Sequence, residues 1–255
     1  MHESESLKGR FWEVDLTRGL AVIMMIVFHF VYDLDYFGIR SSNISTGFWF
    51  YFARATAGLF ILLVGISLVL STSRAEMQGK RGQIFAGLLK RGLWIFFLGA
   101  IVTLATYILV GDGFIVFGIL HFIGISIILA YPFLSLRPRA MNLVFGAAAI
   151  AIGLFLQARS YPTPWLLWLG LAPEGFYTLD YVPIFPWFGV VLIGIFLGGV
   201  LYGGYRRNFP LPDISGSFSA RLLCIMGQNS LIIYLVHQPL IVATLVLLGY
   251  ASYPG

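Results

Sequence analysis

Charge and cysteine are both scarce in this chain of 255 residues. Only 11% of the residues are charged, whereas 59% are hydrophobic, and the mean hydropathy is +0.88. Soluble domains carry roughly 25% charged residues, so the composition excludes a soluble protein and indicates an integral membrane protein. Cys224 is the only cysteine, which excludes an intrachain disulfide and is typical of a small apolar core residue.

Long polar segments and internal repeats are also missing. We therefore expect a single transmembrane domain over residues 1–255. The opening "MHESESLKGRFWEVD" has no apolar core and no small-residue cleavage site, which predicts a cytoplasmic segment over residues 1–15 and not a signal peptide. The net charge is +5, and the basic residues lie in short loops between apolar runs. This pattern is typical of membrane proteins that follow the positive-inside rule and does not indicate binding of nucleic acid.

Seven apolar stretches are long enough to be read as membrane spans. They cover residues 16–37, 48–70, 88–110, 114–134, 141–157, 183–202 and 227–249. Lys and Arg gather in alternate loops, so the positive-inside rule places the N-terminus in the cytoplasm and the C-terminus outside. The sequence predicts an all-α, polytopic helix bundle of about seven transmembrane helices in the plasma membrane, surrounded by lipids and compatible with an oligomer. Residues 158–182, rich in Pro, Trp and Tyr, form the expected extracytoplasmic loop.

Ionisable residues inside these spans mark candidate sites, because each is costly unless it faces a polar interior. At 1.5 Å per residue, His29, Arg54 and His121 lie about 12, 9 and 10 Å below the outer ends of their helices. His237 lies about 15 Å from Gly227 by the same rise, close enough to meet the others from below. A lone membrane histidine is equally compatible with a simple hydrogen bond between helices.

His29 and Asp33 are four residues apart, so both lie on one helix face and Asp33 can accept a hydrogen bond from the imidazole. A carboxylate that orients a histidine is the arrangement that general-base chemistry requires. We therefore expect His29 with Asp33, or His121, to be catalytic. The structural alternative is that His29 bonds to a neighbouring helix and Asp33 marks the water boundary. Arg54 needs a counter-ion or an anionic ligand, for which Asp33 and Asp180 are candidates.

Arg18 lies in the first turn of its helix, where the backbone already carries partial positive charge, so an anion is expected nearby. Asp15, three residues earlier, can form a local pair with it. Alternatively, Arg18, Gly19 and basic loop residues that include Lys90 and Arg91 form a cytoplasmic cradle for a phosphorylated donor. In that case Gly19 lets the ligand or a helix approach closely.

Six stretches carry a family resemblance. In chain order they read "EVDLTRGLAVIMMIVFHFVYD", "GLFILLVGISLVLS", "KRGLWIFFLGAIVTLAT", "GILHFIGISIILAYPFL", "PWFGVVLIGIFLG" and "GQNSLIIYLVHQPL". This order resembles the bacterial and archaeal branch of the heparan-alpha-glucosaminide N-acetyltransferase catalytic-domain family over nearly the whole chain. The most specific pieces are D-x-x-R-G at Asp15, Arg18 and Gly19, "GILHFIG" and "NSLIIYLVHQP".

The resemblance implies membrane-embedded acyl transfer. Acetyl-CoA is the co-substrate, taken from the cytosolic side, and the acetyl group passes to an amino or hydroxyl group of an extracytoplasmic glycan or similar acceptor. No metal is expected. The match at Asp15, Arg18 and Gly19 carries over to this chain as part of the donor site.

Two departures from the family limit what carries over. The eukaryotic enzymes are longer, with additional spans and a lumenal domain for the sugar, so the resemblance does not identify the acceptor. Their active-site histidine lies just outside the first conserved span, where this chain reads "GIRSSNISTG" and has no histidine. The prediction of His29 as the base therefore rests on its depth and its pairing alone.

Acyl transfer also needs groups that bind the substrates and polarise the acyl carbonyl. Five residues are candidates for these roles: Arg54, Asp180, Trp187, Asn229 and His237. Two other classes of function use the same side chains. One is a carrier with a proton relay of histidines and acids, and the other is a haem protein with two histidine ligands chosen from His29, His121 and His237.

Overall fold

The computed structural model describes residues 9–162 and 164–250. These residues form helices and no β-strand, apart from one isolated bridge between Phe117 and Tyr181, so the all-α prediction is confirmed. The chain divides into two compact units, one made of residues up to 60 and from 211 onward, the other of residues 61–210. The long helix α3 (Gly47–Met77) contributes to both units. Each unit is described separately below.

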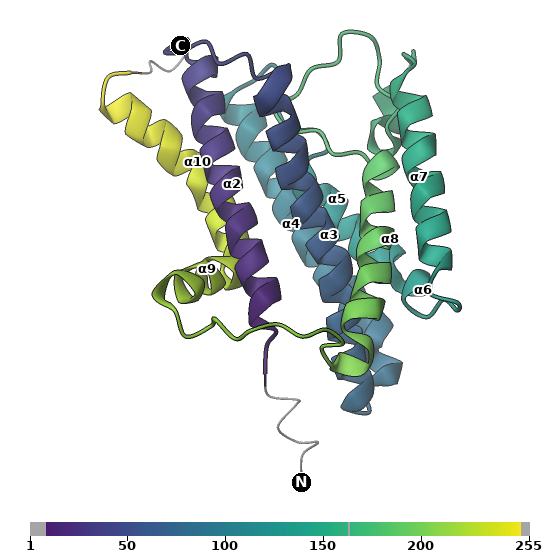
Figure 1. The fold of residues 1–255 in the computed structure, drawn as a ribbon. Coiled ribbons are helices and arrows are strands. Elements are labelled where there is room, and N and C mark those ends of the chain that lie inside the picture. Colours follow the sequence, from purple (N-terminus) through teal and green to yellow (C-terminus); the bar gives the residue numbers. More distant parts are fainter. Residues whose placement is uncertain (1–8, 163, 251–255) are drawn as a thin grey trace. The chain divides into compact units, whose positions relative to one another are not determined.

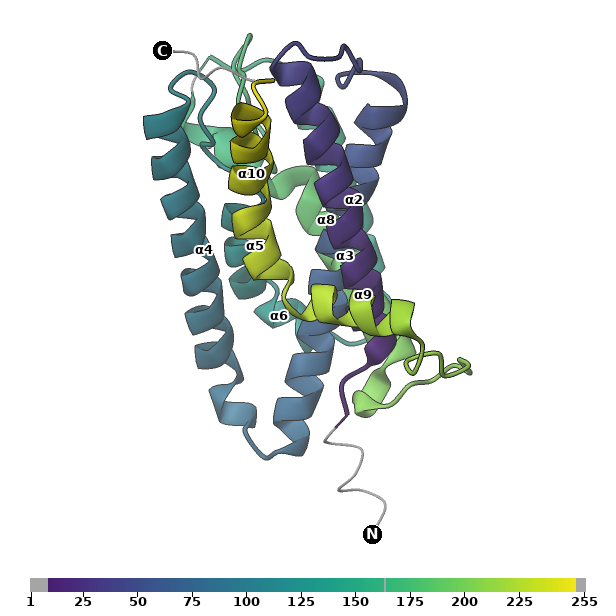
Figure 2. The same ribbon diagram turned by 90° about the vertical axis from the view of Figure 1, so that its left-hand side faces the viewer.

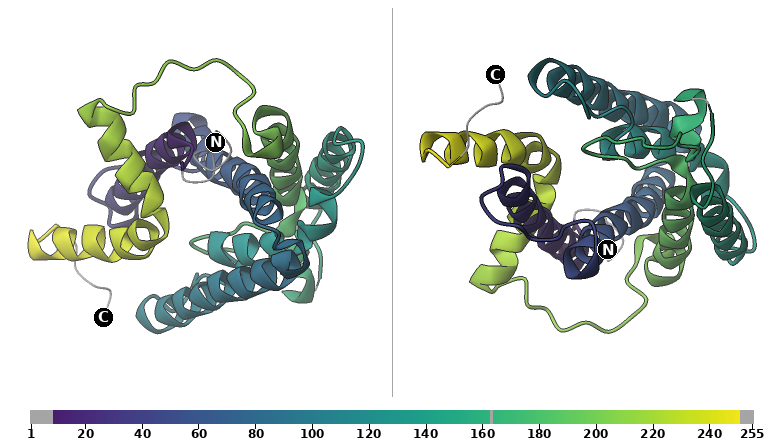
Figure 3. Two further views of the ribbon diagram at one scale, coloured as in Figure 1. Left: turned by 90° about the horizontal axis from the view of Figure 1, so that it is seen from below. Right: turned by 90° about the horizontal axis from the view of Figure 1, so that it is seen from above.

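The first unit contains α2 (Trp12–Tyr36), the first part of α3, α9 (Phe218–Gln228) and α10 (Ser230–Leu247). Within this unit α2 and α10 run in the same direction, and α9 lies crosswise to both of them (Figure 1 and Figure 2). End-on views show α10 leaning away from α2 towards its C-terminal end (Figure 3). The side-chain contacts between the two helices join the C-terminal half of α2 to the N-terminal half of α10, where His29 meets His237 and Asp33 meets Gln238.

Two glycines allow α9 to approach the first turns of α2. A Cβ atom on Gly19 would meet the backbone carbonyl of Leu223, and one on Gly227 would meet the backbone carbonyl of Asp15. Any larger residue would force the backbones apart, which close-packed interiors do not tolerate. The glycine of the D-x-x-R-G motif is thus needed for a helix contact.

The second unit holds the rest of α3 and the helices up to residue 210. They are α4 (Ile84–Leu109), α5 (Ile119–Leu129), α6 (Tyr131–Leu134), α7 (Met141–Gln157) and α8 (Ile184–Leu201), with 3-10 turns at Arg81–Gln83, Pro164–Leu169 and Gly203–Tyr205. Here α7 packs beside α8, and α4 beside α5 (Figure 1 and Figure 2). Gly65 of α3 and Gly194 of α8 bring those two helices into backbone contact.

Five helices of the described residues are long and apolar enough to cross a membrane. They are Trp12–Tyr36, Gly47–Met77, Arg81–Leu109, Ile184–Tyr205 and Ser230–Leu247. Two of the seven expected spans are shorter: α5 has 11 residues and α7 has 17, against about 20 for a span perpendicular to the bilayer. The structure thus supports five spans by length and composition, whereas the count of seven and the orientation of the termini stay predictions.

Helix α9 has no counterpart among the seven predicted apolar stretches. It begins at Phe218, where Ser217 is the N-cap and its side chain accepts a hydrogen bond from the backbone N–H of Ala220 at 3.2 Å. Its sequence "FSARLLCIMGQ" mixes polar and apolar residues, so a hydropathy window does not detect it. A capping serine followed by an amphipathic turn is the signal that would have found it.

Candidate functional site

Two histidines of the first unit meet between α2 and α10. Nδ1 of His29 lies 3.2 Å from Nε2 of His237, and the ring centroids are 4.7 Å apart in an edge-to-face arrangement. His237 is buried, with 6% of its surface exposed, and His29 is half-buried. The structure therefore brings together two of the candidate residues that lie 208 positions apart in the sequence.

Backbone carbonyls determine which nitrogens of this pair carry protons. Nδ1 of His237 lies 2.7 Å from the carbonyl oxygen of Tyr234, and Nδ1 of His29 lies 2.9 Å from that of Met25. A carbonyl only accepts, so both Nδ1 atoms are donors in the neutral rings. The single Nδ1–H of His29 is then shared between the Met25 carbonyl and Nε2 of His237, as a bifurcated hydrogen bond. Nε2 of His29 is the one ring nitrogen of the two histidines that is not used in these contacts. Its lone pair has no partner among the described residues.

Asp33 does not pair with His29, contrary to the prediction from their spacing. Its Oδ1 accepts a hydrogen bond of 2.7 Å from Nε2 of Gln238, while its Oδ2 is buried and unpartnered among the described residues. The Oε1 atom of Gln238 is buried and unpartnered in the same way. The rule for residues four apart identifies neighbours on one helix, but here a residue of α10 competes successfully, and His237 takes the orienting position beside His29.

His121 lies in the second unit and is buried in an aromatic setting. Its ring stacks on Phe117 with centroids 5.6 Å apart and meets Phe96 edge to face at 5.0 Å. Nε2 lies 3.5 Å from Oγ1 of Thr103, a long contact, because that hydroxyl donates its proton to the carbonyl of Ile115 at 2.7 Å. Nδ1 is buried without a partner among the described residues. These contacts are those of a packed core residue.

Arg54 and Asp180 belong to different units, and each has a contact within its own unit. The guanidinium of Arg54, on the part of α3 in the first unit, lies 3.6 Å from the ring centroid of Phe50, a cation–π contact. Asp180 belongs to the second unit, where its Oδ2 accepts from the backbone N–H of Ile119 at 2.8 Å. The carboxylate thus caps the N-terminus of α5, where negative charge is favourable.

Burial affects the ionisation of this capping carboxyl. Desolvation raises the pKa of Asp180 from 3.8 to about 6, although the hydrogen bond from Ile119 favours the charged form. Gly118 makes room for the carboxyl, because a Cβ atom there would meet Oδ2 of Asp180. Asp180 therefore has a structural task that spacing in the sequence could not reveal.

Asp15 is the centre of a polar cluster where α2 meets α9. Arg18 Nη1 donates to its Oδ1 at 3.0 Å, Arg10 Nε donates to its Oδ2 at 3.0 Å, and Gln228 Nε2 donates to the same Oδ2 at 3.1 Å. Only 5% of the Asp15 side chain is exposed. The local pair of Asp15 and Arg18 is formed, as the spacing predicted, and it is one part of a larger network.

The four remaining candidates lie at separate places. Lys90 and Arg91 are exposed on α4 of the second unit, and Trp187 is half-buried on α8. Asn229 is exposed between α9 and α10, where its Nδ2 donates to the carbonyl of Ile225 at 2.8 Å. Their roles in binding stay predictions.

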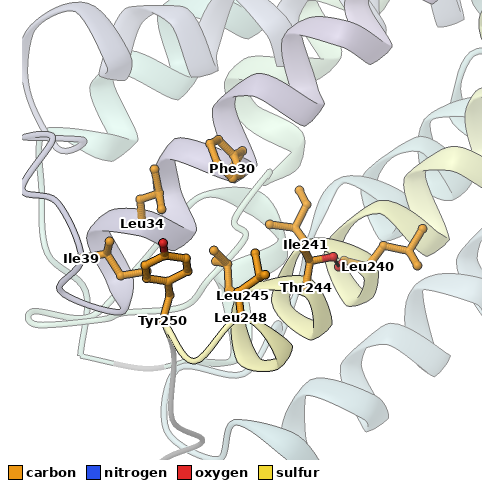
Figure 4. Close-up of a pocket in the computed structure, with 9 residues that line it drawn as sticks. All are labelled: Phe30, Leu34, Ile39, Leu240, Ile241, Thr244, Leu245, Leu248 and Tyr250. Atoms are coloured by element: carbon orange, nitrogen blue, oxygen red, sulfur yellow. Dashed lines mark hydrogen bonds between the residues drawn. The ribbon is translucent and has the colours of Figure 1, made fainter.

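An apolar groove lies between the C-terminal halves of α2 and α10 in the first unit, with a volume of about 370 Å³ (Figure 4). Nine residues line this α2–α10 groove: Phe30, Leu34, Ile39, Leu240, Ile241, Thr244, Leu245, Leu248 and Tyr250. Its single aliphatic hydroxyl, on Thr244, donates to the carbonyl of Leu240 at 2.7 Å. The groove thus offers almost pure hydrocarbon surface.

Sequence reasoning missed Gln238 and Gln228, the partners of Asp33 and Asp15. Each is the neighbour of a candidate residue in the final motif stretch: Gln238 directly follows His237, and Gln228 directly precedes Asn229. A neutral amide carries no charge to attract notice in a hydropathy scan. Both amides are nevertheless visible in the sequence, Gln238 between His237 and Pro239 and Gln228 beside Gly227. Polar groups in apolar stretches require hydrogen-bond partners, and this is the signal that could have found them.

A comparison with known protein families identifies the family of this chain. The sequence profile of the family described as "Heparan-alpha-glucosaminide N-acetyltransferase, catalytic" matches residues 10–239, a range that includes the Asp15 cluster, the histidine pair and Gln238. No curated protein and no solved structure matches the chain significantly. Because the profile covers most of the chain, the protein belongs to the heparan-alpha-glucosaminide N-acetyltransferase catalytic-domain family.

Proposed function

We propose that the protein is a membrane-embedded acyltransferase that moves an acetyl or short acyl group from cytosolic acyl-CoA to an amino or hydroxyl group of an extracytoplasmic glycan or similar acceptor. Membership of a membrane acyltransferase family supports the reaction class. The observation that carries the proposal is the histidine pair, in which His237 orients His29 and leaves the lone pair on Nε2 of His29 available.

In the proposed reaction, Nε2 of His29 takes the proton from the acceptor's amine or hydroxyl as that group attacks the thioester carbonyl. The C–S bond of the thioester then breaks, and the proton passes to the departing CoA thiolate. His29 carries a positive charge in between, and its Nδ1–H donates to Nε2 of His237 throughout. A base oriented by a second group contributes about 10² to 10⁴ in rate.

The Asp15 cluster is proposed as part of the donor site, with Arg18 as the residue that contacts a phosphate of acetyl-CoA. Arg18 is only 19% exposed and already shares Asp15 with Arg10. A guanidinium can contact a phosphate through two hydrogen bonds at once, which suits Arg18 to an anionic ligand. Lys90 and Arg91 are proposed as further phosphate-binding residues on the cytoplasmic side.

Two rival functions use the same histidines. Haem ligation by His29 and His237 together would require a porphyrin between them, whereas their nitrogens are in direct contact at 3.2 Å. A proton-coupled carrier would use the pair as a relay and would leave acyl-CoA intact. Absorbance of the purified protein near the haem band and release of CoA from acyl-CoA separate both rivals from the acyltransferase.

The test is acceptor-dependent release of CoA by purified protein in nanodiscs. We expect free thiol to appear only when acetyl-CoA and an amine or hydroxyl acceptor such as a glucosamine glycoside are both present, and the acetylated acceptor to be found by mass spectrometry. Intact acetyl-CoA with every acceptor of this kind would contradict the proposal.

A further inference from the structure

We infer that the acceptor is an amphiphile: its single hydrocarbon chain lies in the α2–α10 groove, and its polar head donates hydrogen bonds to Asp33 and Gln238. This inference rests on the proposed function, because it names the class of acceptor used by the same site. It draws on three features of the first unit. They are the groove, the two polar pairs near it (His29 with His237, and Asp33 with Gln238), and the unpartnered oxygens of the second pair.

The groove and the polar residues share the same turns of the same helices. On α2, Phe30 and Leu34 line the groove, and His29 and Asp33 precede them by one position each. One position turns the helix by about 100°, so polar and apolar residues occupy adjacent faces of two consecutive turns. On α10, the pair His237 and Gln238 likewise comes just before the groove residues. The polar residues do not line the groove, but a chain in the groove lies within one helical turn of His29 along α2.

The chemistry of the groove selects a hydrocarbon chain. Its lining is apolar, and the hydroxyl of Thr244 is already used by the carbonyl of Leu240. A volume of about 370 Å³ lies within the range of small-molecule sites, which run from about 300 to 1,000 Å³. A free sugar would lose its hydrogen bonds to water in such a place, whereas an alkyl or isoprenoid chain would lose none.

The head of the ligand is indicated by two buried oxygens. Oδ2 of Asp33 and Oε1 of Gln238 have no hydrogen-bond partner among the described residues, and Asp33 is only 2% exposed. Both atoms accept and neither donates while the Asp33 carboxylate is ionised, so they cannot satisfy each other. Buried acceptors of this kind are costly unless a donor reaches them. Hydroxyl and amino groups of a head group are suitable donors.

The experiment uses acceptors that differ only in chain length: methyl, hexyl and dodecyl glycosides of glucosamine, offered to the full chain in nanodiscs. We expect kcat/KM to rise by about fourfold for each methylene that the groove buries. Thr244→Trp fills the groove and should flatten this dependence. Ala243→Trp is the matched control, because Ala243 is the exposed neighbour of Thr244 on α10 and does not line the groove.

The two variants encounter the same concentration of each glycoside in the bilayer, so their difference reports on the groove and not on partitioning. Equal kcat/KM for methyl and dodecyl acceptors in the wild type would overturn the inference while the proposed function stands. A Thr244→Trp effect that follows the chain length of the acyl-CoA, and not that of the acceptor, would assign the groove to the donor and also overturn it.

Photolabelling provides a readout that does not depend on turnover. A dodecyl glucosaminide with a diazirine at the chain end should label groove residues such as Ile241 and Leu248 in the wild type and in Ala243→Trp, but not in Thr244→Trp. Uniform labelling of lipid-facing helices would mean ordinary boundary lipid and would refute the site. If no acceptor is acetylated but the groove is labelled selectively, the proposed function fails and the amphiphile site stands.

The head-group contacts are tested separately with Gln238→Leu. Loss of one hydrogen bond to the ligand should lower kcat/KM for the dodecyl acceptor by about tenfold, while the dependence on chain length persists. Unchanged kcat/KM would exclude Gln238 from the acceptor site.

Discussion

Replacing Arg18 with glutamine tests whether the cluster around Asp15 holds the acyl donor or only joins two helices. Nη1 of Arg18 lies 3.0 Å from Oδ1 of Asp15, in a pair whose side chains are 19% and 5% exposed. Arg10 and Gln228 remain on Asp15 after the change. We therefore expect Arg18→Gln to lower the free energy of unfolding by only about 1–2 kcal/mol, near the lower end for hydrogen bonds to charged groups.

A contact between Arg18 and a donor phosphate would add a second effect. Losing that charge-assisted bond should weaken acetyl-CoA binding by about 1.5–3 kcal/mol, or roughly ten- to a hundredfold. Arg18→Lys should restore only part of the affinity, because an ammonium cannot reproduce the two-pronged guanidinium contact.

Arg10→Gln is the matched control for this experiment. Its Nε also lies 3.0 Å from Asp15, but its side chain is 61% exposed, so its loss should cost little stability and leave donor affinity unchanged. Calorimetric titration of acetyl-CoA into the wild type and the three variants in nanodiscs gives the comparison. Indistinguishable affinities for wild type and Arg18→Gln would refute the assignment of Arg18 and leave the donor phosphates to Lys90 and Arg91.

Three further predictions concern the fold. Gly19→Ala should destabilise the protein by about 1–3 kcal/mol through overpacking against Leu223. Gly216→Ala is the control and should not destabilise it, because nothing lies within 4 Å of the added Cβ atom. Equal melting temperatures of the two variants would contradict the α2–α9 contact. The pKa of Asp180 is raised from 3.8 to about 6, so its stabilising contribution is complete below pH 3.8 and is lost as the pH rises through 6. This loss is at most about 3 kcal/mol. Asp180→Asn should therefore reduce the pH dependence of thermal unfolding between about pH 4 and 6, and an unchanged profile would count against the role of Asp180. In a Cys224→Ala background, Gln78→Cys should resist an impermeant thiol reagent in intact cells and Glu174→Cys should react, and the reverse pattern would invert the topology.

Hydropathy and helical spacing predicted the long helices because a bilayer requires continuous apolar runs. The same reasoning overlooked α9, whose 11 residues are amphipathic, and read one span over residues 114–134, where the structure has α5 and the single turn α6. A hydropathy window averages over such short elements. Helix caps and glycine contacts are the local signals that it does not use.

The candidate site shows a similar division. The pairing of Asp15 with Arg18 is local and followed from a spacing of three residues. The partners of Asp33 and Asp180 are not local: Gln238 is 205 positions from Asp33, and Ile119 is 61 positions from Asp180. Spacing along one helix cannot rank a same-helix neighbour against a side chain or backbone group that tertiary packing brings to the same oxygen.

The rate of acetyl transfer by His29→Gln tests the central claim most directly. With acetyl-CoA and a glucosamine glycoside at saturation, the account predicts that this variant is slower than the wild type by about 10² to 10⁴ and binds acetyl-CoA as tightly. His121→Gln, measured in parallel, should retain transfer provided that it folds. Full activity of His29→Gln together with loss of transfer in a folded His121→Gln protein would contradict the account and assign the base to His121.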